Sequence, residues 1–309
     1  MRIHLDTDFG GDTDDACALA MLLGWSGVEI TGITTVADPG GRRAAYVAYL
    51  LQLAGRDEIP LAAGAEVSST TLDRADPVDD ERHWPADITS RPSPPGAALD
   101  LLARSLDAGA TLVAIGRYTN LALLEISCAG SLAREPVVVM GGWLHQPAPG
   151  LPQWGPGMDF NVQWDTRAAE VVAATARLTL VTLPVTLNAH LRRTDLPRLR
   201  AAGPLGQLLA RQSEAHGQTH QMEKLGRGHA GLPDDLLNFQ YDPVACAVAL
   251  GWSAARVEVM RMRPVRRDGV LSFQTHPEGR WTRVVVAVDG AAFRETWLSA
   301  VERAARNSS

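Results

Sequence analysis

Short apolar runs with strand character alternate along this chain with longer runs of helical character, and this alternation constrains the fold more than any other feature. The strand-like runs are Ile3–Leu5, Ile30–Val36, Leu112–Ile115, Val137–Met140 and Leu178–Leu183. The helix-like runs between them are Arg42–Ala54, Ala97–Ala108, Leu121–Ser127 and Thr166–Ala176. This order predicts βαβ units and an α/β fold, with a mostly parallel, Rossmann-like central sheet flanked by helices. Ligands of such sheets bind at the carboxyl ends of the strands, so functional residues are expected there.

The last third of the chain departs from this alternation. Arg192–Asp235 is rich in charged residues, Gln, Gly and His, and it predicts a helix at Leu196–Gln212 and a mobile, lid-like loop at His216–Gly231. A small antiparallel extension of two strands and a closing helix is predicted at Val257–Arg263, Thr282–Val288 and Ala291–Ala305. With no internal repeat and no clear linker, residues 1–309 are expected to form a single domain.

Charge and composition argue against two classes of partner. The net charge of −6 argues against a nucleic-acid surface, which usually carries a basic excess. No run approaches the ~18 apolar residues of a membrane span, and the N-terminus lacks the apolar core of a signal peptide.

The three cysteines, Cys17, Cys128 and Cys246, lie far apart in apolar surroundings, which predicts buried free thiols and a reducing compartment, the cytoplasm.

Five aspartates crowd into ten residues at the front of the chain. They are Asp6, Asp8, Asp12, Asp14 and Asp15. The run lies between the first predicted strand and an apolar helix-like stretch that starts near Ala16, so the carboxylates share one turn. Like charges this close repel one another unless a cation neutralises them, and a hard cation with oxygen ligands fits best.

Other interpretations of this aspartate turn are weaker or remain open. Helix capping accounts for one or two of the acids but not for five. A calcium-binding EF-hand loop fails, because counting from Asp6 places Gly10 at position 5 and Cys17 at position 12. A phosphoryl-transfer enzyme with Asp6 or Asp8 as nucleophile stays open on this motif alone, although the chain has no glycine-rich phosphate loop.

The aspartate run resembles the signature D-x-D-P-G-x-D-D-A of the inosine-uridine preferring nucleoside hydrolases. Phe9 stands at the place of the proline, and the spacing between Asp8 and Asp14 is two residues longer. Five further segments resemble family patterns in the family order. They are Gly32–Val36 (G-x-T-T-V), Gly116–Ala122 (G-P-L-T-N-L-A), Met140–Gly142 (M-G-G), Asp159–Asn161 with Asp165 (E-F-N…D), and Tyr241–Ala245 (H-D-P-x-A).

The resemblance implies calcium-dependent hydrolysis of the N-glycosidic bond of ribonucleosides, which gives ribose and a free base. In the family a calcium ion holds the ribose diol and the attacking water. Carried over to this sequence, its ligands are Asp8, Asp15, Asp242 and the backbone carbonyl of Thr119, and Asp8 is also the general base. The resemblance further implies a nucleoside substrate, a nucleoside hydrolase type of α/β fold, and a homodimer or homotetramer.

The resemblance implies three polar residues as contacts of the ribose, and a fourth has two possible interpretations. Asp14 and Asn161 match the family's ribose-binding positions. Asp159 stands where glutamate is usual and is implied to bind the 5′-hydroxyl. Asp38 either accepts a bond from a ribose hydroxyl or is simply a turn residue before a proline.

The resemblance assigns roles to the residues around the leaving base less clearly, because the sequence departs from the family pattern there. Tyr241 stands where the family has a histidine, and its ordinary pKa of ~10 makes it a weaker acid. His83 or His229 either reaches the base or is a histidine of a surface loop. Trp143 or Trp154 is expected to form a wall of the base pocket. These departures from the family pattern leave open a non-catalytic protein that binds nucleosides or ribose on the same scaffold.

Overall fold

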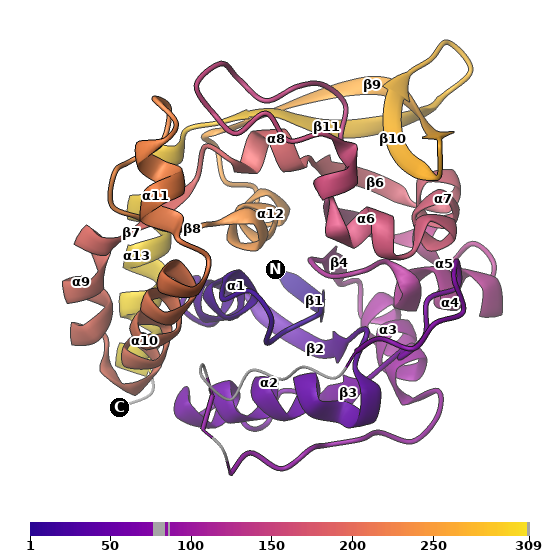
Figure 1. Ribbon diagram of the computed structural model, residues 1–309. Helices are drawn as coiled ribbons and strands as arrows, with labels where there is room; N and C mark the ends of the chain where they lie inside the picture. Colours follow the sequence, from indigo (N-terminus) through magenta and orange to yellow (C-terminus); the bar gives the residue numbers. More distant parts are fainter. Residues whose placement is uncertain (77–83, 86, 308–309) are drawn as a thin grey trace.

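A nine-stranded sheet forms the centre of the computed structural model, which describes residues 1–76, 84–85 and 87–307 (Figure 1). From one edge to the other its strands are β10 (Val270–Thr275), β9 (Ala255–Arg267), β11 (Arg280–Val288), β6 (Arg177–Val181), β5 (Pro136–Met140), β4 (Thr111–Ala114), β1 (Arg2–Thr7), β2 (Glu29–Thr35) and β3 (Leu61–Ala63). The strands from β11 to β3 pair in parallel, whereas β9 pairs antiparallel with β10 and β11. The predicted mostly parallel sheet with an antiparallel C-terminal part is therefore confirmed.

Helices cover both faces of this sheet (Figure 1). They are α1 (Asp14–Leu23), α2 (Arg42–Leu53), α3 (Ala97–Asp107), α4 (Thr119–Ser127), α5 (Ser131–Arg134), α6 (Phe160–Trp164), α7 (Thr166–Thr175), α8 (Leu183–Thr186), α9 (Leu196–Ala201), α10 (Gly203–Thr219), α11 (Met222–Arg227), α12 (Tyr241–Ala249) and α13 (Gly290–Asn307). Side chains of α1, α10, α12 and α13 share the larger buried core, and those of α3, α4 and α7 share a second one. Because both faces are covered, the central strands are buried along most of their length, as parallel strands usually are.

The predicted lid is helical instead. Helix α10 continues to Thr219, α11 follows almost at once, and a two-stranded ribbon forms from β7 (His190–Arg192) and β8 (Leu236–Phe239). The polar sequence hid this packing, because the buried side of α10 carries His216 and Gly217 as well as leucines. A Cβ on Gly217 would lie 3.0 Å from the Leu237 side chain, so the helix lies directly against β8.

The prediction that all three cysteines are buried is wrong for one of them. Cys17 and Cys246 are buried, but Cys128 is exposed because it lies just beyond the end of α4. Among the described residues, no helix is long and apolar enough to cross a membrane.

Candidate active site

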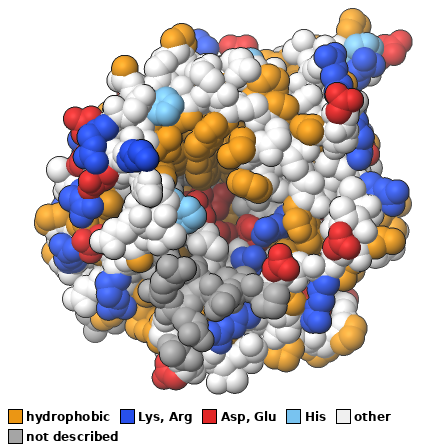
Figure 2. Space-filling model, in the orientation of Figure 1, with side chains coloured by type: hydrophobic (Ala, Val, Ile, Leu, Met, Phe, Trp, Pro, Cys, Tyr) orange, Lys and Arg blue, Asp and Glu red, His pale blue; other side chains and the backbone are white. Residues whose placement is uncertain are grey.

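The carboxyl ends of β1, β4, β5 and β6 open into one cavity of about 310 Å³. Figure 2 shows it as a hollow with acidic side chains at its floor and hydrophobic side chains along one wall. The acidic lining is Asp8, Asp12, Asp14, Asp15, Asp159 and Asp242. The apolar lining is Ile115, Met140, Trp154, Met158, Phe160 and Leu183. The strand ends therefore converge on a site, as expected for a sheet of this kind.

Three buried carboxylates at the floor of the cavity could hold a metal ion. Asp14 and Asp15 lie in the first turn of α1, Asp242 lies in the first turn of α12, and one oxygen from each falls within 4.8 Å of the others. Burial, followed by repulsion between these carboxylates and their acidic neighbours, raises the pKa of all three. Such a site is costly without a cation, and its hard oxygen donors suit a divalent one.

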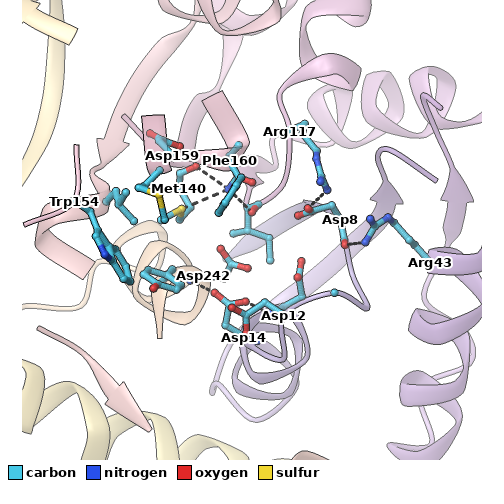
Figure 3. A pocket seen from close by; sticks show the side chains of 17 residues that line it. Asp8, Asp12, Asp14, Arg43, Arg117, Met140, Trp154, Asp159, Phe160 and Asp242 are labelled. Atoms are coloured by element: carbon cyan, nitrogen blue, oxygen red, sulfur yellow. Dashed lines mark hydrogen bonds and ion pairs between the residues drawn. The ribbon is translucent and has the colours of Figure 1, made fainter. Parts of the chain in front are cut away.

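Asp8 does not belong to this three-carboxylate cluster. Its carboxylate forms an ion pair with Arg117, while the Arg43 guanidinium donates to the Asp8 backbone carbonyl (Figure 3). A Cβ on Gly116 would lie 2.6 Å from the Asp8 backbone nitrogen and 2.7 Å from Asp8 Oδ1, so glycine is needed for the two strand ends to approach this closely. Of the predicted ligands, Asp15 and Asp242 are thus in the cluster and Asp8 lines the same cavity beside it, while Asp14, expected to contact ribose, is also in the cluster.

Thr119 is not among the residues that line the cavity. It is the first residue of α4, and its hydroxyl donates to the Asp165 carboxylate over 2.8 Å. Ile115 lines the cavity instead, at the end of β4, and its carbonyl accepts a bond of 2.8 Å from the Asn161 amide. Ile115, four residues before Thr119, is therefore the residue whose backbone carbonyl lies at the cavity in this segment.

Besides Asp14, two of the predicted ribose contacts line the cavity, Asn161 and Asp159. Asn161 donates to the Ile115 and Met140 carbonyls over 2.8 and 3.3 Å, which leaves its side-chain oxygen for a ligand. Asp159 is buried and accepts from the backbone amides of Gly142 and Val162, so it caps the start of α6. Burial raises the pKa of Asp159 to about 6. The Asp159 side chain is shorter than the glutamate usual in the family, and these bonds hold its carboxylate at the cavity wall.

Asp38 and His229 lie outside the cavity lining. The Asp38 carboxylate is buried and accepts from the Thr35 hydroxyl and from the amides of Arg43 and Ala44, where α2 begins. It is not among the cavity-lining residues, and all of these bonds lie within the turn between β2 and α2. His229 donates from Nδ1 to the Leu225 carbonyl and is not in the lining either. His83 lies outside the described residues.

Tyr241 and one tryptophan form the apolar end of the cavity. Burial, followed by the charges of Asp12, Asp14 and Asp242, raises the pKa of Tyr241 well above 10, so the phenol keeps its proton. Trp154 lines the cavity, and its carbonyl accepts a bond of 3.0 Å from the Trp143 indole. Trp143 itself is not in the lining, because its ring is turned to support the Trp154 loop.

A model of the inosine-uridine preferring nucleoside hydrolases matches residues 3–295 of the chain. The chain belongs to this family. The pyrimidine-specific ribonucleoside hydrolase RihA of Salmonella agona is 32% identical over 248 residues, which are 76% of this chain and 77% of that relative. A purine-preferring ribonucleoside hydrolase from Gardnerella vaginalis has the same fold, with a TM-score of 0.80, 21% identity and 99% of both chains covered. The plant nucleoside hydrolase PpNRh1 gives a TM-score of 0.79 at 20% identity, over 97% of this chain and 98% of that one.

As a member of this family the protein is an N-ribosyl hydrolase. Three of the charged residues that line its cavity had no predicted role, namely Asp12, Arg43 and Arg117. Asp12 accepts a bond of 2.5 Å from the Asn238 amide of β8 and lies 3.8 Å from the Nδ1 atom of His216. The two-residue expansion of the aspartate turn thus brings this turn into contact with β8 and α10.

Beneath the cavity of this nucleoside hydrolase, Asp6 is buried between strands and accepts from Thr34 and Asn120, over 2.5 and 2.7 Å. Burial raises its pKa from the ordinary 3.8 to about 7. Between these values the folded chain keeps a proton that the unfolded chain has lost, so Asp6 stabilises the fold less as the pH rises. Buried His4, with its pKa lowered to about 3, acts in the opposite direction below pH 6.5.

We therefore expect Asp6→Asn to become more stable relative to the parent as the pH rises from 5 to 8. The measurement is the melting temperature of both proteins, stripped of metal with a chelator, at four pH values in this range. His4 bonds the same Thr34 hydroxyl as Asp6, so the comparison is read above pH 6.5, where His4 is largely neutral in both the folded and the unfolded chain. A constant difference across the range would show that Asp6 has no raised pKa.

Proposed function

We propose that this nucleoside hydrolase depends on a calcium ion held by Asp14, Asp15 and Asp242, with the Ile115 carbonyl as a further ligand. The cluster of three buried carboxylates within 4.8 Å carries this proposal. Carboxylate and backbone oxygens from three separate strand ends form an irregular set, and Ca²⁺ accepts six to eight such ligands at flexible angles. Mg²⁺ demands a nearly ideal octahedron and is the less suitable ion.

The bound ion would hold two ribose hydroxyls and lower the pKa of the attacking water. Asp8 is the cavity carboxylate best placed to take the water's proton, because it stands beside the cluster without being buried in it. Asn161 would hold the ribose with its free side-chain oxygen. The acidic floor also favours the positive charge that develops on the sugar as the glycosidic bond breaks.

The leaving base would lie against the apolar end of the cavity. Trp154 and Tyr241 both line this end, and a flat aromatic ring accepts purines and pyrimidines alike. Because Tyr241 keeps its proton, it donates a hydrogen bond to the base rather than transferring a proton. We propose that the chain acts as a single domain in the cytoplasm, as a homodimer or homotetramer, without nucleic acid or membrane partners.

Ribose release from a panel of nucleosides tests this function. The panel contains uridine, cytidine, inosine, adenosine and guanosine, since relatives named for pyrimidines and for purines both resemble this chain. We expect ribose from at least one nucleoside with Ca²⁺ present, loss of turnover with excess chelator, and recovery when Ca²⁺ is restored. Binding of nucleosides without turnover of any of them would instead support a non-catalytic binding protein.

A further inference from the structure

One buried side chain, Phe239, supports the apolar end of the cavity from behind. Its ring meets the Trp154 ring edge-on, with 5.6 Å between the ring centres and 73° between the ring planes, and it lies 5.4 Å from the Tyr241 ring. Trp154 and Tyr241 line the cavity, whereas Phe239 is fully buried and is not in the lining. Edge-to-face contacts of this kind favour one relative orientation of the rings. Phe239 therefore touches both aromatic walls of the cavity without reaching into it.

The fold holds Phe239 itself firmly in place. It is the last residue of β8, where it pairs with His190 of β7, and the two rings lie 5.8 Å apart. The His190 ring is fixed in turn, because its Nε2 donates to the Leu187 carbonyl over 2.8 Å. Buried apolar side chains from several separate segments share the same small core: Leu151, Leu187, Met222, Leu232 and Leu236. A ring packed on so many sides has little freedom to move, and it can hold its aromatic neighbours in position.

The ribose end of the cavity is supported by other parts of the protein. Trp154 lies at the far end of the cavity from Arg43 and Arg117 (Figure 3). Asn161, the proposed ribose contact, is held by the Ile115 and Met140 carbonyls, and both of these residues belong to the larger core. A change at Phe239 should therefore disturb the contacts of the base and leave those of the ribose intact.

We propose that Phe239 is a positioning residue for the leaving base, because it fixes the orientation of the Trp154 and Tyr241 rings before the substrate binds. This inference rests on the proposed function, which places the base against these two rings. An ordered wall makes binding stronger, since neither side chain has to be immobilised when the base arrives. It follows that Phe239 contributes to the binding of nucleosides but not to the binding of ribose alone.

The test compares KM for the best nucleoside with the inhibition constant of ribose, both measured on the full-length protein at saturating Ca²⁺. Phe239→Leu and Phe239→Met remove the ring but keep an apolar side chain. Each is expected to raise KM roughly fivefold or more, within the range for a disturbed base-stacking contact, and to leave the ribose constant within about twofold of the parent. Phe293→Leu is the matched control. Phe293 is equally buried and meets one tryptophan edge-on, Trp252 at 5.4 Å and 78°, but it lies in α13 outside the cavity lining.

A Trp154→Ala background shows whether Phe239 acts through the wall that it supports. In that background Phe239→Leu should raise KM by no more than about twofold, because one of its two aromatic neighbours is already gone. An equal rise in both backgrounds, a similar rise in Phe293→Leu, a parallel rise in the ribose constant, or no rise at all would overturn the proposal.

Failure of the proposed function gives a different result. If the parent releases ribose from no nucleoside, that function fails, and the same variants are compared by their dissociation constants for nucleosides, measured by calorimetry. Weaker nucleoside binding in Phe239→Leu but not in Phe293→Leu would still support the positioning role. Unchanged constants, or no nucleoside binding by the parent, would overturn it as well.

Discussion

Asp8→Asn is expected to lower kcat for nucleoside hydrolysis by roughly 10²–10⁴-fold, the range for loss of a general base. The amide that replaces the carboxylate cannot take a proton from water, while the fold and the three-carboxylate cluster remain. The measurement is kcat and KM for the best nucleoside at saturating Ca²⁺, with the melting temperature as a check on folding.

Asp12→Asn is the matched control for that experiment, because Asp12 lies in the same turn, lines the same cavity and is not in the cluster. We expect its kcat to stay within about tenfold of the parent, below the usual range for a general base. An Asp8→Asn enzyme that keeps more than a tenth of the parent's kcat would show that another group activates the water.

Asp242→Asn is expected to change metal binding and stability in opposite directions. Ca²⁺ affinity should fall by roughly 100-fold or more, since affinity follows the number of charged ligands. The metal-free protein should become more stable at pH 8, because one of three mutually repelling buried carboxylates is gone. A gain of ~1 kcal/mol in a chain of this size corresponds to a rise in melting temperature of about 2 °C.

Two measurements check this pair of effects: titration with Ca²⁺, and thermal unfolding in a chelator. Exposed Asp234, which lies in the loop before β8, provides the control variant Asp234→Asn, and both quantities should stay at the parent's values. A less stable metal-free Asp242→Asn protein would mean that the carboxylates stabilise one another through a shared proton instead of repelling.

The central strands and their functional ends could be predicted because burial on both faces leaves a strong apolar signal in the sequence. The five predicted strands correspond to β1, β2, β4, β5 and β6, and the cavity opens at the ends of four of them. The short strands were missed, since three residues in β3 or β7 carry too little pattern. Strand β10 had a usable signal: Asp268 and Gly269, both with positive φ, form the two-residue turn that joins it to β9.

The sequence predicted where the site lies better than it predicted the contacts that the side chains make there. The aspartate turn, Asn161 and Asp242 all reach the cavity. A backbone carbonyl such as that of Ile115 leaves no mark in the sequence, because any residue supplies one. The pairing of Asp8 with Arg117 joins residues 109 positions apart, and it depends on how two side chains turn within a shared cavity. Sequence patterns establish which residues are present there but not which partner each one takes.

The most direct test of the metal centre is a crystal structure of the protein with Ca²⁺, with the ion located by its anomalous scattering. The prediction is one ion in the cavity, with oxygens of Asp14, Asp15 and Asp242 and the Ile115 carbonyl at ~2.3–2.6 Å. An empty cluster at saturating Ca²⁺, or an ion bound elsewhere while nucleosides are hydrolysed, would contradict the proposed role of the metal.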